Sequence, residues 1–170
     1  QGSRFNPNNV KTSAVASGDE VVLNGAKTAV LGAPNAQTII VSARESGAAT
    51  DADGISLFLV DANAAGVSIK SYTTIDGRKA GEVTLADVRV PATARLGAAG
   101  GSAATLAAVI DRATLAVAAE AVGAMDSLLT KTVEYSKTRK QFGTAIGTFQ
   151  ALQHRMADMF IQCQLARSIV

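Results

Sequence analysis

The chain has 170 residues, of which 48% are hydrophobic and 18% charged, so it can bury a core and is not disordered over its whole length. Sixteen basic and fourteen acidic residues leave a net charge of +2, which disfavours a protein that mainly binds the nucleic-acid backbone. One cysteine and one histidine exclude an internal disulfide and a structural zinc site, and no metal is expected. With no apolar run of about 18 residues and no signal-like start, we expect a cytoplasmic protein without a membrane span.

The first hundred residues predict a β domain. Residues 20–23 and 27–31 flank the dipeptide Asn24-Gly25, which is typical of a tight turn, so we expect a hairpin there. Further strands are predicted at 38–43, 55–60, 67–72 and 82–90. The strand at 38–43 is rich in β-branched residues and is expected to be buried on both faces. Pro91 is expected to end the strand at 82–90. A spacing of about ten residues between strands indicates an antiparallel barrel or sandwich.

The remaining residues predict two helices. From about Ser102 to Thr138, apolar residues recur at intervals of three and four without a proline, which predicts one helix of about ten turns. A loop over 143–148 follows. Thr148 is the expected N-cap of a second helix that begins near Phe149.

These patterns together predict an α+β chain with two domains. We expect a β domain over 1–100 and the start of a helical domain over 101–170. The second helix has no stop signal at Val170, and two helices with one sheet leave apolar faces uncovered. Both domains are therefore expected to be incomplete, either as a piece of a larger protein or as a chain that needs partners.

Basic residues crowd the end of the long predicted helix, over 135–143. One interpretation is a solvated helix end that suits the helix dipole, with Gly143 as its C-cap. The other is an anion site, because the Arg139 guanidinium can grip a pyrophosphate at two points. Gln150 opens the next helix, where backbone N–H groups also favour anions. Arginine, loop and glutamine together could hold a dinucleotide.

Several runs resemble the acyl-CoA dehydrogenase family, in the family's order and over most of the chain. The two that resemble its helix pair are 139–143 (RKQFG) and 146–154 (IGTFQALQH). Those that resemble its middle β domain are 23–27 (LNGAK), 54–60 (GISLFLV), 88–91 (VRVP) and 96–97 (LG). Within the family, the chain is most similar to the small-subunit type of pimeloyl-CoA dehydrogenase, through 72–78 (YTTIDGR) and 119–123 (AEAVG).

The resemblance implies FAD-dependent α,β-dehydrogenation of an acyl-CoA thioester to a 2-enoyl-CoA. The protein's share of such a reaction is to orient acyl chain and flavin, polarise the thioester carbonyl and supply a carboxylate base. An electron-transfer flavoprotein or a similar acceptor takes the electrons. The resemblance also implies a homo- or hetero-oligomer, arranged as a dimer of dimers.

The resemblance implies three groups of cofactor contacts. Arg139 matches the arginine that contacts the FAD phosphates, typically from the neighbouring subunit of a dimer. Its flanking contacts are Gln141, Phe142 and Gln150. The flavin-facing strand residues are Ala29, Val30 and Leu31, where Ala29 replaces the usual aromatic residue and Leu31 the usual hydroxyl. The tail of a loop that touches both flavin and substrate is matched by Gly2 and Ser3.

Substrate contacts are implied less completely. Besides Ser3, the residues that match the segment near the acyl-CoA pantetheine are Asp111, Arg112 and Thr114. Thr114 stands where an arginine is common, unless Arg112 substitutes for it. The family's glutamate base lies either beyond Val170 or at the position of Ala113, so no catalytic residue is expected in this chain and the 170 residues alone are expected to be inactive.

Two other functions remain open. The chain could be a non-catalytic partner subunit that helps to bind FAD across an interface while another chain supplies the base; the residues that favour this are Ala29, Leu31, Ala113 and Thr114. It could also be a cofactor-free interaction module. Glu120 is expected in an ion pair between helices or on an exposed stripe rather than in a catalytic or ligand-positioning role. His154 is expected to pack or hydrogen-bond rather than to catalyse.

Overall fold

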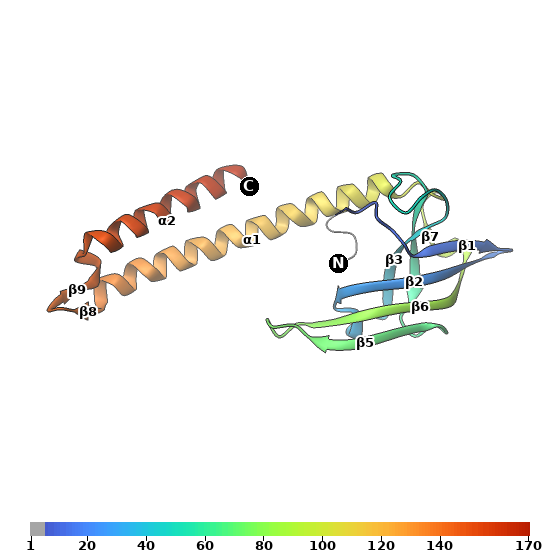
Figure 1. The fold of residues 1–170 in the computed structure, drawn as a ribbon, viewed down its shortest axis with the longest axis horizontal. Coiled ribbons are helices and arrows are strands. Elements are labelled where there is room, and N and C mark those ends of the chain that lie inside the picture. Colours follow the sequence, from blue (N-terminus) through green and yellow to red (C-terminus); the bar gives the residue numbers. More distant parts are fainter. Residues whose placement is uncertain (1–5) are drawn as a thin grey trace. The chain divides into compact units, whose positions relative to one another are not determined.

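The computed structural model describes residues 6–170, which fall into two compact units that divide between Ala108 and Val109. Gly2 and Ser3, two of the predicted cofactor contacts, lie outside the described residues. The first unit contains a seven-stranded sheet, and the second is helical (Figure 1).

The sheet contains β1 (Ser13–Ser17), β2 (Glu20–Leu31), β3 (Thr38–Arg44), β4 (Ile55–Asp61), β5 (Val67–Thr73), β6 (Lys79–Pro91) and β7 (Arg95–Leu96). Their order across the sheet is β5-β6-β2-β1-β3-β4-β7. Two 3₁₀ turns, η1 (Ala33–Asn35) and η2 (Ala92–Ala94), come after β2 and β6. Every pair of neighbours is antiparallel except β1 and β3, which meet in parallel only at Ser13 and Arg44.

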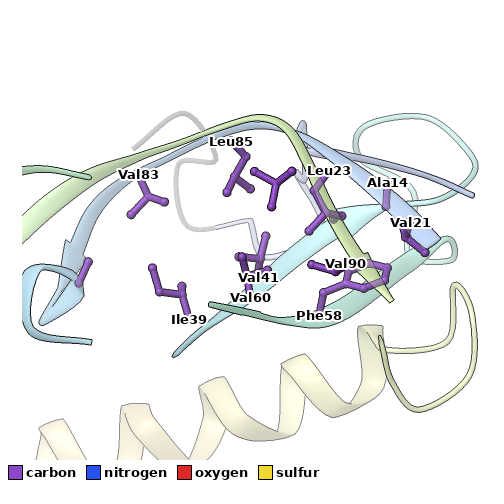
Figure 2. Close-up of a cluster of buried hydrophobic side chains, with 13 residues drawn as sticks. Ala14, Val21, Leu23, Ile39, Val41, Phe58, Val60, Val83, Leu85 and Val90 are labelled. Atoms are coloured by element: carbon purple, nitrogen blue, oxygen red, sulfur yellow. The ribbon is translucent and has the colours of Figure 1, made fainter. Parts of the chain in front are cut away.

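The sheet folds into two layers because β1 is short. β1 pairs with β2 only as far as Asn24, so the longer β2 continues beyond it with β6 alone, while β3 continues with β4. Side chains of the β2–β6 layer face those of the β3–β4 layer (Figure 2). The fully buried residues there include Leu23, Val41, Phe58, Val60, Val83 and Val88. A core of aliphatic side chains around one phenylalanine agrees with a chain that is only 4% aromatic.

The structure confirms the predicted α+β fold and corrects it at the first hairpin. β2 continues through Asn24 and Gly25, where its register with β6 shifts, and the turn lies earlier, at Gly18-Asp19 between β1 and β2. Asn24 is held in the strand because its Nδ2 donates to Asp87 Oδ1 at 2.9 Å while Asp87 N donates to its Oδ1 at 2.8 Å. A Cβ on Gly25 would lie 2.8 Å from the Thr12 backbone, so close approach rather than turning requires that glycine.

The prediction that both faces of the strand at 38–43 are buried is also wrong. Burial alternates along β3, with Ile39 and Val41 in the core and Ile40 62% exposed. A run of β-branched residues occurs both in strands buried on two faces and in strands buried on one. The residue types therefore do not reveal which face is covered.

The helical unit continues α1 (Ala103–Thr138), which confirms the long predicted helix, and ends with α2 (Gln150–Ile169). Between them lie β8 (Lys140–Gln141), β9 (Thr144–Ala145) and the 3₁₀ turn η3 (Ile146–Thr148). The helices are joined by an ion pair between Asp126 and Arg167. Among the described residues, no helix combines the length and the apolar character needed to cross a membrane.

Candidate functional site

The connection between α1 and α2 gathers the residues of the predicted anion site. Arg139 comes directly after α1, and its backbone is fixed on both sides: its N–H donates to Tyr135 O at 2.9 Å, and Ile146 N donates to its carbonyl at 2.8 Å. Its exposed guanidinium makes no hydrogen bond or ion pair within residues 6–170. The five N–H donors of the Arg139 guanidinium, whose backbone is fixed, are therefore available to a ligand.

A strained turn that begins three residues after this arginine carries an exposed aromatic ring. β8 and β9 are joined by Phe142-Gly143, both with positive φ (53° and 80°), as a type I′ hairpin turn requires. Phe142 is not a glycine, so this conformation is unfavourable, and it leaves the side chain 92% exposed. Its ring meets Phe149 edge-on at 6.2 Å between centroids. Strain of this kind points to a functional constraint. The structure replaces the expected helix C-cap at Gly143 with this hairpin.

The start of α2 offers further donors. The expected N-cap Thr148 does not cap, because its hydroxyl donates to Ala145 O at 2.7 Å. Phe149 occupies the N-cap position and offers no side-chain acceptor. Its carbonyl accepts from Leu152 N and Gln153 N, so the N–H groups of α2 left without a side-chain cap are those of Gln150 and Ala151. An uncapped helix N-terminus attracts anions.

A close backbone approach holds this connection together. A Cβ on Gly147 would lie 2.9 Å from Ser136 Oγ and 3.0 Å from its carbonyl oxygen, so glycine lets η3 pass the end of α1 without displacing Ser136. The arrangement brings Arg139, Gln141, Phe142 and Gln150 into one short segment. Its donors suit a ligand that only accepts hydrogen bonds, such as a pyrophosphate, so the chemistry of this donor set fits the phosphates of FAD.

The predicted flavin-facing residues lie in the first unit, at the end of β2. The β2–β6 register shifts between Lys27 and Val30, and Ala29 there has φ 53°. Val30 packs against the core, whereas Leu31 is 61% exposed. These three residues offer an apolar surface and backbone groups but no aromatic ring or hydroxyl, so they fit a flavin ring only through backbone and van der Waals contacts.

Sequence reasoning missed Lys27. Its Nζ donates to Ser42 O at 2.6 Å and to Ser42 Oγ at 3.0 Å, and burial lowers its pKa from 10.5 to about 8. No sequence signal marked it, because only the strand register places Lys27 directly opposite the core residue Val83. A cation on the inward face of a strand needs a polar partner, and that partner lies on another strand.

The predicted substrate contacts on α1 are all exposed. Thr114 Oγ1 donates to Ile110 O at 2.8 Å, whereas Asp111 and Arg112 form no ion pair within the described part of the chain. Glu120 and His154 are exposed as well, which agrees with the exposed stripe expected for Glu120. Within this unit, nothing brings these side chains together into a catalytic group.

Comparison with known protein families identifies the family of the chain. Residues 1–88 match the family model described as acyl-CoA dehydrogenase, middle domain, and residues 95–170 match the model described as acyl-CoA dehydrogenase, C-terminal domain. The chain belongs to the acyl-CoA dehydrogenase family, whose members are oxidoreductases acting on CH–CH groups.

Individual relatives differ in their named activities. The probable acyl-CoA dehydrogenase YngJ of Bacillus subtilis is 36% identical over 163 residues, which cover 94% of this chain and 43% of that protein. The caffeyl-CoA reductase-Etf complex subunit CarC of Acetobacterium woodii is 31% identical, over 99% of this chain and 45% of its own. A glutaryl-coenzyme A dehydrogenase structure with glutaryl-CoA superposes with a TM-score of 0.86 at 30% identity, over 94% of this chain and 41% of that one. The chain thus spans less than half the length of these relatives.

Proposed function

We propose that this chain is part of a flavoprotein that removes two hydrogens across the α and β carbons of an acyl-CoA thioester and gives a 2-enoyl-CoA. Family membership supports the reaction class. The observation that carries FAD is the Arg139 guanidinium, which has no ion-pair partner within residues 6–170, in the same connection as the start of α2, which no side chain caps. FAD, when bound, supplies the hydride acceptor for this chemistry.

The two parts of the chain have different tasks in this proposal. The β domain over 1–100 presents the backbone of Ala29–Leu31 to the flavin ring, and the helical part over 101–170 binds the phosphates. Arg139, with Gln141 and Gln150, donates hydrogen bonds to the pyrophosphate, and the exposed ring of Phe142 flanks it.

Substrate handling is shared among groups on α1. Asp111, Arg112 and Thr114 lie within one turn of α1 and offer one carboxylate, one guanidinium and one hydroxyl to the amides of the pantetheine arm. Ala113 has no side chain that could accept the α-proton, so the base belongs to residues outside this chain. We further propose an oligomer and an electron-transfer flavoprotein as electron acceptor; the relative CarC is named as a subunit of an Etf complex.

The test is the FAD affinity of Arg139→Ala in the complete oligomer of the protein that contains this chain. Loss of a charged, two-point phosphate contact of about 1.5–3 kcal/mol weakens FAD binding roughly 10- to 150-fold. Arg155→Ala is the matched control, because Arg155 is an exposed arginine on α2. Fluorescence titration of apoprotein with FAD measures both. Equal affinities of Arg139→Ala and the wild type would contradict the assignment.

A second candidate is a non-catalytic partner subunit that binds FAD across an interface. The absence of an aromatic ring at Ala29, of a hydroxyl at Leu31 and of a carboxylate at Ala113 favours it. Anaerobic addition of acyl-CoA to the complete protein that contains this chain, purified without other chains, separates the candidates: bleaching of the bound flavin supports the dehydrogenase, and bound but unbleached flavin supports the partner subunit. A protein that takes up no FAD would instead be a cofactor-free module.

A further inference from the structure

β2 contains a bulge that needs a physical cause. Lys27 pairs with Val83 and Val30 with Gly81, so Thr28 and Ala29 together stand opposite Glu82. We call these two residues the β2 bulge. Ala29 adopts φ 53°, a left-handed conformation that is unfavourable for an alanine. Such a residue persists only where its surroundings fix it.

The described residues contain one useful contrast. Asp87 also has a positive φ, 51°, but its amide and carboxylate are both hydrogen-bonded to the side chain of Asn24. Asp and Asn tolerate this conformation because their side chains bond locally. Ala29 has no polar side chain, so whatever fixes it must come from neighbouring residues.

Two charged side chains anchor the strand around the β2 bulge. Lys27 reaches from β2 to the other layer, where its Nζ donates to both the carbonyl and the hydroxyl of Ser42 on β3. From β6, Glu82 Oε1 accepts two long hydrogen bonds of 3.4 Å, from Ala29 N and from the Tyr72 hydroxyl. The bulge is therefore bounded by an ammonium tied to β3 and a carboxylate on β6.

Stability alone does not explain Lys27. Its cross-strand neighbour Val83 belongs to the core, and an apolar residue at position 27 would extend that core without desolvating a charge. Burial lowers the pKa of Lys27 to about 8, and no carboxylate forms an ion pair with it within residues 6–170. β1 covers the neighbouring edge of β3 only at Arg44, so β2 has no strand partner on that side at Lys27. The hydrogen bonds from Lys27 to Ser42 connect β2 to β3 at this point.

We propose that Lys27 is a positioning residue that fixes β2 to β3 beside the β2 bulge and, together with Glu82, sets the backbone of Ala29–Leu31 for contact with the flavin ring. The inference rests on the proposed function for its cofactor. Its structural half, a tie that holds the bulge rigid, concerns only residues of this chain.

The first test compares Lys27→Met with Lys27→Arg in the full chain, and uses Lys11→Met as a control because Lys11 is exposed on the same unit. Methionine keeps the length of the side chain and removes the donors, whereas arginine keeps charge and donors. We expect FAD to bind Lys27→Met about five- to tenfold more weakly, with a changed visible circular dichroism of the flavin. Lys27→Arg restores both towards wild type, and Lys11→Met matches wild type. All are measured where far-UV circular dichroism shows a folded protein.

The second test needs no cofactor. Amide hydrogen exchange of residues 28–31 in the FAD-free protein is expected to accelerate about tenfold or more in Lys27→Met, while exchange in β3 and β4 stays unchanged. If Lys27→Met does not fold, Ser42→Ala and Glu82→Gln replace it, with effects of about two- to fivefold in the same direction.

The outcomes separate the two proposals. A wild type that binds no FAD overturns the proposed function, and the exchange experiment still decides whether Lys27 ties the bulge. A folded Lys27→Met with wild-type FAD affinity, flavin spectrum and exchange overturns the positioning role. So does a Lys27→Arg that behaves no better than Lys27→Met, because the tie would then not depend on the donors.

Discussion

At the scale of single residues, Arg44 shows how one buried side chain organises a loop. Its guanidinium donates to six backbone carbonyls, at 2.8–3.3 Å, those of Asn8, Val10, Ser46, Ala49, Asp51 and Asp53. No carboxylate in the described part of the chain forms an ion pair with it. The planar guanidinium serves acceptors in several directions at once, which the three donors of a lysine cannot do.

Arg44→Lys is therefore expected to leave several of these carbonyls, most of them part-buried, without a donor. We expect the free energy of unfolding to fall by about 3 kcal/mol, measured by urea denaturation. Arg89→Lys is the control, because Arg89 is an exposed arginine of the same sheet, in an ion pair with Glu20, and its replacement is expected to cost less than about 1 kcal/mol. Equal losses in the two variants would contradict the role given to Arg44.

Single residues also show what the sequence could and could not predict. Arg139 and Gln150 could be predicted as donors because helix ends and basic residues are visible in a short stretch of sequence. Lys27 could not, because its partner Ser42 lies 15 residues away on a strand of the other layer. Side-chain partners of this kind depend on the layer arrangement, which propensity and periodicity do not determine.

At the scale of elements, Glu45 fastens the end of strand β3 to the segment between β6 and α1. It accepts hydrogen bonds from Arg95 Nη2 at 2.5 Å, from Gly100 N at 3.1 Å and from the Ser56 hydroxyl. Burial alone would raise the pKa of Glu45, but the hydrogen bonds from Ser56 and Arg95, the positive charge of Arg95 and the Gly100 amide together lower it below 4.5. Charged Glu45 thus ties β4, β7 and the loop before α1 to one point.

The lowered pKa gives this cluster a pH dependence. The unfolded state binds a proton at Glu45 more readily than the folded state, so the stabilisation is present above about pH 4.5 and is lost as the pH falls below it. We expect the free energy of unfolding of wild type to fall more steeply between about pH 5 and pH 3 than that of Glu45→Gln. Thermal unfolding at several pH values measures both slopes, and parallel curves would refute the expectation.

Two glycines flank β5 and test the packing of its ends separately from backbone strain. Gly66 and Gly77 have similar φ values, 88° and 82°. A Cβ on Gly66 would collide with the carbonyl oxygen of Ala86 on β6, whereas a Cβ on Gly77 meets nothing within 4 Å. Gly77→Ala is expected to cost about 1 kcal/mol of unfolding free energy, from the backbone conformation alone. Gly66→Ala is expected to cost at least about 2 kcal/mol more, because a backbone must shift. If the two variants lose similar unfolding free energy in urea denaturation, backbone strain alone accounts for the cost of both substitutions.

Elements also differ in how well their patterns could be interpreted. α1 could be predicted from an uninterrupted spacing of three and four over 36 residues, a signal that no competing structure imitates. β1 was missed because Ser-Ala-Val-Ala-Ser carries one strongly β-forming residue. The predicted Asn24-Gly25 turn was wrong because Asp87, far along the chain, satisfies Asn24 within the strand. Tertiary contacts thus overrode a local turn signal.

At the scale of the whole molecule, the family resemblance relates residues that lie far apart in the sequence to the same kind of cofactor. Ala29–Leu31 and Arg139 lie in different units, and no sequence pattern connects them. The proposed function connects them instead, because the resemblance implies that Arg139 contacts the flavin cofactor of a neighbouring subunit. This assignment has a consequence for mixed oligomers, because each FAD site would then draw on two chains.

Two variants with weakened FAD sites test the shared site. One chain carries Arg139→Ala and the other Lys27→Met, and differently tagged copies are refolded together so that mixed dimers can be isolated. If each site combines β2 of one subunit with Arg139 of its partner, one of the two sites in a mixed dimer contains neither change. About half of the sites then recover wild-type FAD affinity, although neither parent variant has it. If each site is formed within one chain, every site keeps one change and FAD titration shows no tight fraction. The titration therefore reports directly whether Arg139 acts across the subunit boundary.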